Sequence, residues 1–134
     1  MDGDVPAAEH EDLVRRLTAA YEQIITRAHT AGIKVAGATI LPFVGSNYYQ
    51  PGPANEADRQ AVNKWIRTPG NFDALLDFDK VTRDPEHPER LLPAFDCGDH
   101  LHPSPSGYAA MGQAIPLSLF APKGSPASIE KSIT

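Results

Sequence analysis

The stretch IKVAGATIL at residues 33–41, closed by Pro42, decides the fold of this chain. Its residues are almost all apolar or small, and the run is far shorter than the roughly 20 apolar residues that a membrane helix needs. A continuous run of this length is typical of a strand with both faces buried, as in a parallel sheet, whereas a half-exposed strand alternates apolar and polar residues. We therefore predict a buried strand at residues 33–41 and no membrane span.

Helical patterns flank this strand on both sides. Residues 9–31 place apolar side chains at three- and four-residue spacing, and Gly32 is suited to end that helix in a left-handed conformation. A second helix is predicted at residues 55–67, with the first of them, an asparagine, as its N-cap. A second short strand follows at residues 72–78. A serine and a proline then begin a third helix at residues 104–115.

The order helix, strand, helix, strand, helix predicts a layered α/β fold. Two buried strands alone make an incomplete sheet, because each leaves backbone groups and an apolar flank without partners. We therefore expect residues 1–120 to be a portion of a larger domain, or to associate with a second copy through the exposed sheet edge. Small and polar residues from 121 to 134 predict a flexible tail.

Composition narrows the classes of function. A chain of 134 residues is the size of one domain, and its net charge of −5 comes from scattered acidic residues. Nucleic acid is not expected as a partner, because phosphate binding needs clustered Lys and Arg. One cysteine, Cys97, excludes an internal disulfide and a cysteine-based zinc site. No signal peptide is recognisable at the acidic start, and the cellular location stays open.

The residues that carry chemistry are Asp99 and His102, which lie three apart just before the third helix. A neutral imidazole can take a proton from a serine hydroxyl and return it to a leaving group. For this role a carboxylate must hold the other ring nitrogen and stabilise the imidazolium that forms. A three-residue spacing across a tight turn lets an aspartate fold back onto the histidine ring. By spacing alone, a loop Asp and His are also compatible with surface groups or helix caps.

The residues around this pair sharpen the interpretation. The segment GDHLHPSPSGY at residues 98–108, followed by AAMG, resembles the last block of the SGNH (GDSL) hydrolase family. In that block an Asp and a His three residues on precede a Pro, a small polar residue, a Gly and a C-terminal helix. The upstream helix and the strand ending in Pro42 are also similar to that family, and the resemblance covers roughly residues 10–120.

The resemblance implies an ester hydrolase (an esterase or lipase) with a flavodoxin-like, three-layer α/β/α fold, of which this chain carries the C-terminal strands and helices. It implies that His102 is the general base, that Asp99 orients it, and that no cofactor is needed. The family's Gly-Asp-Ser block has no counterpart here, since Gly3-Asp4 is followed by Val5, and its two oxyanion blocks are also missing. We therefore expect the isolated chain to be inactive, or active only through a partner chain that supplies the serine.

Other interpretations remain open for some residues. Tyr48 and Tyr49 follow the first predicted strand, and loops at strand C-termini line the active crevice of α/β sheets, so they are candidate substrate-binding residues or an ordinary surface loop. A metal site is not expected, because ligands crowded along one loop rarely all point at one ion; the residues considered are Asp96, Cys97, Asp99, His100 and His102. A non-catalytic, self-associating α/β module is the alternative to an enzyme.

Overall fold

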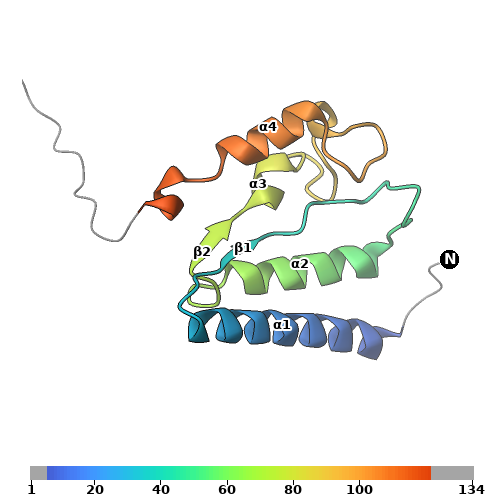
Figure 1. Cartoon of the computed structure of the whole chain (residues 1–134). Helices are drawn as coiled ribbons and strands as arrows, with labels where there is room; N and C mark the ends of the chain where they lie inside the picture. The colour runs from blue at the N-terminus through green and yellow to red at the C-terminus, as the bar shows by residue number, and fades with distance from the viewer. Residues whose placement is uncertain (1–5, 122–134) are drawn as a thin grey trace, which may run out of the picture.

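The computed structural model describes residues 6–121 and shows two parallel strands with helices on both sides (Figure 1). Helix α1 (Ala7–Thr30) leads into strand β1 (Ala36–Ala38), and helix α2 (Pro53–Arg67) carries the chain to strand β2 (Ala74–Leu76). The two strands pair in parallel over all three residues of each. The predicted α/β fold with a parallel sheet is therefore confirmed.

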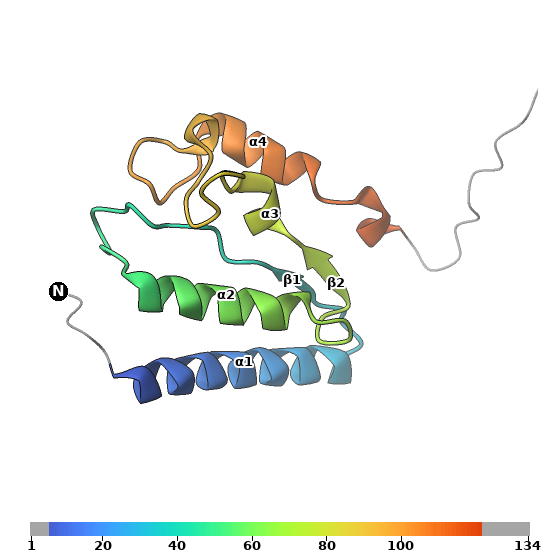
Figure 2. The same ribbon diagram turned by 180° about the vertical axis from the view of Figure 1, so that it is seen from behind.

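The remaining elements follow β2. Helix α3 (Phe78–Thr82) begins two residues after the strand, and helix α4 (Pro105–Gln113) comes after a long loop region. Two 3-10 helices complete the described chain, η1 (Pro93–Phe95) and η2 (Leu117–Phe120). Both views place α1 and α2 together on one side of the strands and α3 and α4 on the other (Figures 1 and 2). The predicted tail at 121–134 lies outside the described residues, apart from its first.

The prediction that residues 33–41 form a strand buried on both faces is wrong in extent and in burial. Only the three residues of β1 pair with a neighbouring strand, and Ala36 and Ala38 are exposed while Gly37 is buried. The buried side of Gly37 lies against the ring of Phe72, which a Cβ there would approach to 2.3 Å. The described residues thus cover one face of β1 and leave the other face exposed, although the apolar sequence of this segment is typical of a strand buried on both faces.

The core lies between α1, α2 and the sheet. It contains the buried side chains Ile25, Val62 and Ile66, and burial of each such side chain contributes about 1.5–3 kcal/mol. An aromatic cluster closes the core near the C-terminal ends of both helices, with ring centroids 5.6 to 6.1 Å apart between Tyr21, Trp65 and Phe72. Gly32 has a φ of +72°, as expected for the residue that turns the chain out of α1.

Side-chain hydrogen bonds stabilise the starts of α2 and α4. Helix α2 begins two residues earlier than predicted, and the Asn55 side chain acts from within its first turn by accepting the backbone N–H of Gly52 at 2.9 Å. In α4 the predicted N-cap is confirmed, because the Ser104 hydroxyl accepts the backbone N–H of Gly107 at 3.2 Å. This cap fixes the direction in which the chain leaves the Asp99–His102 segment.

A buried ion network joins α2 to the end of β2. The Arg59 side chain is 1% exposed, and its Nη1 donates to Asp79, which is fully buried, at 2.7 Å. Glu56 accepts from the same guanidinium, and the second oxygen of Asp79 accepts from Arg67 at 2.5 Å. Although burial lowers the pKa of Arg59, its hydrogen bonds to Glu56 and Asp79 hold that pKa above its ordinary value. The network also binds the carbonyl oxygen of Ile40, just beyond β1.

Candidate active site

The loop that carries the candidate residues, residues 96–102, lies between η1 and α4 and is closed at its base by backbone hydrogen bonds. The N–H of Cys97 donates to the carbonyl of His102 at 3.0 Å, and the N–H of Ser104 donates to the carbonyl of Phe95 at 2.7 Å. Within the loop, Gly98 and His100 have positive φ angles of 109° and 58°. These conformations reverse the chain tightly, so the loop's N–H groups and side chains face one another.

The expected contact between Asp99 and His102 is present. The Nδ1 atom of His102 lies 2.6 Å from Oδ2 of Asp99, whose Oδ1 accepts the backbone N–H groups of Leu101 and His102 at 2.9 and 2.8 Å. The contact with the His102 ring, followed by these two amides, holds the pKa of Asp99 well below its ordinary range. Asp99 is therefore a charged acceptor that fixes the orientation of the imidazole.

The second ring nitrogen of His102, Nε2, has no hydrogen-bond partner within residues 6–121. The side chain is 63% exposed, so this nitrogen is accessible from outside the loop. An imidazole with one nitrogen held by a carboxylate and the other free is arranged to accept a proton from a neighbouring hydroxyl.

No serine of the described segment is hydrogen-bonded to His102. Ser46 is buried, and its hydroxyl accepts the backbone N–H groups of the next two tyrosines at 3.3 and 3.4 Å. The hydroxyl of Ser104 donates to a backbone carbonyl at 2.9 Å and caps α4. Both hydroxyls thus form hydrogen bonds with the local backbone.

A second histidine–carboxylate pair, Asp96 and His100, lies in the same loop and was considered from the sequence only as metal ligands. Nδ1 of His100 lies 2.5 Å from Oδ2 of Asp96, whose Oδ1 accepts the N–H groups of Gly98 and His100 at 2.8 and 3.0 Å. Partial burial raises the pKa of Asp96, but these hydrogen bonds outweigh it and lower the pKa overall. The only sequence signal was an Asp four residues before a His.

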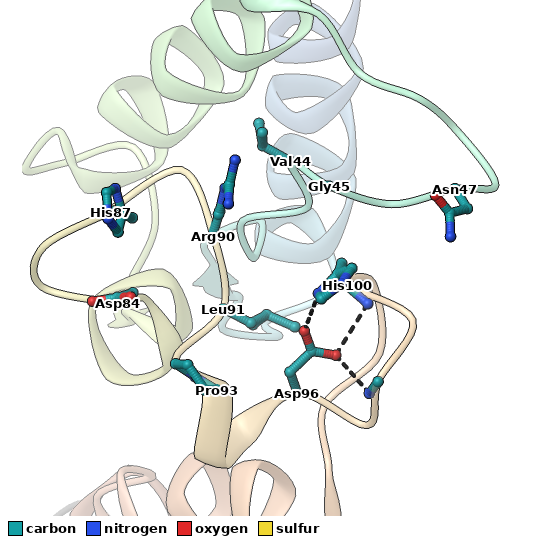
Figure 3. Close-up of a pocket in the computed structure, with 11 residues that line it drawn as sticks. Val44, Gly45, Asn47, Asp84, His87, Arg90, Leu91, Pro93, Asp96 and His100 are labelled. Carbon is teal, nitrogen blue, oxygen red and sulfur yellow. Dashed lines mark hydrogen bonds and ion pairs between the residues drawn. The ribbon is translucent and has the colours of Figure 1, made fainter.

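Two cavities border this loop. One, of about 580 Å³, is lined by His100 and Asp96 together with polar residues of the 84–90 segment (Figure 3). The other, of about 480 Å³, is an apolar cleft, and its lining residues are Ile40, Leu41, Phe43, Tyr49, Pro51, Asn55 and Leu101. His100 and Leu101 are consecutive, so neighbouring residues of one loop face two different cavities, of which the one beside His100 also has charged side chains in its lining.

The two candidate substrate-binding tyrosines differ in their positions. Tyr49 lines the apolar cleft together with Leu101, the residue before His102. Tyr48 is 81% exposed and lines neither of these two cavities, but its ring packs edge-on against Tyr49 with centroids 4.8 Å apart. The structure thus brings Tyr49 to the Asp99–His102 loop and leaves Tyr48 at the outer side of the same tyrosine pair.

The atoms that could bind a metal ion in this loop already form hydrogen bonds. Ligand atoms of Asp96, Cys97 and Asp99 lie within 4.8 Å of one another. Both carboxylates already accept hydrogen bonds from a histidine and from backbone amides. The hydrogen bond to Asp99 raises the pKa of the Cys97 thiol, which keeps the thiol protonated, whereas a metal needs the thiolate.

Comparison with known proteins identifies the family. No helix within the described part of the chain is long and apolar enough to cross a membrane. No curated protein matches the sequence. Residues 2–110, most of the chain, match the family model of the GDSL-like Lipase/Acylhydrolase family, a match that supports hydrolase function of the esterase type. The matched region contains the parallel α/β unit and the Asp99–His102 loop, and the chain belongs to the GDSL-like Lipase/Acylhydrolase family.

Proposed function

We propose that Asp99 and His102 form the acid–base half of an ester-hydrolysing site. His102 accepts through Nε2 the proton of an attacking serine hydroxyl and returns it to the leaving alcohol, while Asp99 holds the ring and stabilises the imidazolium. The observation that carries this proposal is the 2.6 Å contact at Nδ1, which leaves Nε2 accessible. Membership of a lipase and acylhydrolase family supports an ester as the substrate in this proposal.

The nucleophile in this proposal comes from outside residues 6–121, or from a partner chain. No described serine is hydrogen-bonded to His102, and the hydroxyls of Ser46 and Ser104 are engaged with the backbone. Loss of a triad serine costs on the order of 10⁶ in turnover, and loss of an oxyanion donor costs about 10² to 10³. We therefore expect the chain by itself not to hydrolyse esters by the mechanism of its family.

The apolar cleft is the proposed site for the acyl group. Its volume of about 480 Å³ falls in the range of small-molecule sites, and Leu101 joins it directly to His102. Tyr49 and Phe43 present aromatic surface there, with ring centroids 6.3 Å apart. Tyr48 supports the Tyr49 ring from outside and is proposed to contact the exposed end of a longer acyl chain.

The test is release of p-nitrophenol from its short acyl esters. The chain and its His102→Ala variant are expected to give equal release. When the coding sequence immediately upstream of Met1 is included, we expect turnover that His102→Ala abolishes. If the chain itself shows turnover that is lost when one described serine is changed to alanine, the placement of the nucleophile is wrong. Turnover that is indifferent to His102→Ala would disprove the acid–base role.

A second candidate function is a non-catalytic module that associates with a copy of itself. Strand β1 pairs only with β2 among the described residues, and a two-stranded sheet is marginally stable without further cover. Large apolar side chains are exposed on or beside the strands and on α1, including Leu75, Ile24 and Ile33 at 41, 57 and 60%. We propose that two copies pair along the free edge of β1. Sedimentation equilibrium should give a dimer or larger species, and a monomer at every concentration would exclude this association.

A further inference from the structure

The Asp96–His100 pair does not contribute to the proposed proton transfer at His102. The His100 ring is nevertheless held by a carboxylate in the same way as the His102 ring. Asp96 is 9% exposed and accepts three hydrogen bonds, two from backbone amides and one from the His100 ring. His100 itself has a φ of +58°, a conformation that is unfavourable for residues other than glycine. An unfavourable backbone conformation that is held by so many local bonds points to a use for the side chain it orients.

The His100 ring borders the cavity of about 580 Å³. Figure 3 shows His100 and Asp96 on one loop, His87 and Arg90 on another, and the chain near Gly45 on a third. Gly45 has a φ of +101°, and a Cβ there would lie 3.5 Å from the His100 ring, so the third loop packs directly against this histidine. Three separate loops therefore form the walls of the cavity.

The lining combines groups of both charges and a neutral polar group with the apolar side chains of Val44, Leu91 and Pro93. His87, His100 and Arg90 supply donors, Asp84 and Asp96 supply acceptors, and Asn47 supplies both. A carboxylate or phosphate bound beside Arg90 would also face Asp84, and a cation bound beside Asp84 would face Arg90. A hydroxyl group both donates and accepts, so a compound that carries several hydroxyl groups matches this lining better than an ion of either sign.

The cavity also lies close enough to His102 to receive one half of an ester held at that residue. No more than about 7 Å of extended backbone separates His100 from His102. Leu101, between them, faces the apolar cleft. An ester held at His102 can therefore place its acyl group in the cleft and its alcohol half toward His100.

We propose that the cavity beside His100 binds the alcohol half of the ester and selects a hydroxyl-rich, uncharged, sugar-like alcohol. This inference rests on the proposed ester hydrolysis and names its substrate class. In it, Nε2 of His100 and the guanidinium of Arg90 contact the hydroxyl groups, and Asp96 is a positioning residue that sets the direction of the His100 ring.

The test is binding, which requires no turnover. Ring resonances of ¹⁵N-histidine-labelled chain are followed by NMR during titration with methyl α-D-glucopyranoside, and in parallel with acetate. The His100 signals should shift and saturate at millimolar glucoside, with acetate giving no saturating shift. His100→Gln and Arg90→Ala, read through backbone amide signals of the 96–102 loop, should each weaken binding about tenfold, the effect of one lost hydrogen bond to a charged or aromatic donor.

The control is His29→Gln, which removes another exposed histidine that contacts a carboxylate, Asp73, far from this loop in the sequence. It should leave glucoside binding unchanged. A cavity that does not respond to the glucoside, or that responds equally to acetate, would overturn this inference. Binding that persists while esters are hydrolysed independently of His102 would instead retain the cavity site and disprove the proposed hydrolysis.

Discussion

Two regions of this molecule hold carboxylates in opposite ways. Asp79 is fully buried and accepts from Arg59, Arg67 and Arg83, whose guanidinium groups never release a proton at ordinary pH. Asp99 is 45% exposed and contacts the ring of His102, and an imidazole can both accept and donate a proton. The ion pairs of the buried Asp79 network stabilise the fold, whereas the exposed carboxylate of Asp99 holds a histidine ring that can transfer a proton.

The two regions also differ in the range of their contacts. Arg59 and Asp79 are 20 residues apart in sequence, so their ion pair ties together separate elements of the fold. Both carboxylates of the 96–102 loop are held by groups within four residues of themselves. The ion network thus joins distant parts of the chain, whereas the loop is held together by contacts among its own residues.

The largest expected effect is on turnover. In the ester-hydrolysing form of the protein, Asp99→Asn should lower kcat by about 10⁴, because the amide can no longer hold the charged imidazolium or set the ring's protonation. Urea unfolding of the variant is measured in parallel, so that a loss of fold is told apart from a loss of turnover. Asp73→Asn, which alters the carboxylate that contacts His29, is the matched control and should leave kcat unchanged. Equal losses in the two variants would contradict the assignment.

The next effect is on stability alone. Asp79→Ala should lower the free energy of unfolding by about 3–5 kcal/mol, because it removes the fully buried partner of the Arg59 guanidinium and leaves Glu56 as its one remaining carboxylate. Urea denaturation followed by circular dichroism measures this change. Asp12→Ala removes an exposed carboxylate that pairs with Arg15 on α1 and should cost no more than about 1 kcal/mol. If the two variants were equally stable, the buried network would not hold the fold as argued.

A smaller effect is expected where the third loop meets His100. Gly45→Ala should destabilise the chain by about 1 kcal/mol, since its φ of +101° is unfavourable for alanine. Gly112→Ala in helix α4 meets no atoms within 4 Å and should stabilise by about 0.5–1 kcal/mol. Thermal unfolding of both variants gives the comparison, and a shift of the same sign in both would show that backbone conformation at Gly45 is not the cause.

The smallest effect concerns acid. The pKa values of Asp96 and Asp99 are both lowered in the folded chain, so their hydrogen bonds contribute fully above about pH 4 and are lost as the pH falls through the lowered values. Burial opposes the lowering more for Asp96. The amide signal of Gly98, bound to Asp96, should therefore change at a higher pH than that of Leu101, bound to Asp99. NMR titration checks this order, and the reverse order would contradict it.

Patterns in the sequence predicted those structural features that depend on residues close together in the chain. The spacing within α1, the cap at Ser104 and the three-residue step from Asp99 to His102 are local, and each is found in the structure. The helix α3 was missed because five residues are too few to show a helical period. The apolar run at 33–41 predicted burial on two faces, but the sequence does not say whether the described chain supplies both covers.

The rest depends on contacts that no pattern encodes. Arg59 was not recognised as buried, because arginine ordinarily lies at the surface and one of the two carboxylates that favour its burial, Asp79, lies twenty residues further along the chain. The Asp96–His100 pair depends on the left-handed backbone at Gly98 and His100, which follows from the closure of the whole loop. Its four-residue spacing alone does not distinguish a fixed pair from two solvated side chains.

The closure of the 96–102 loop has a consequence for the modularity of this chemistry. Two backbone hydrogen bonds close the base of the loop, and amides of the loop itself orient both carboxylates. The residues that orient both imidazoles therefore lie in one short contiguous segment. Such a segment is portable: inserted ahead of another capped helix, it would bring a preoriented base with it.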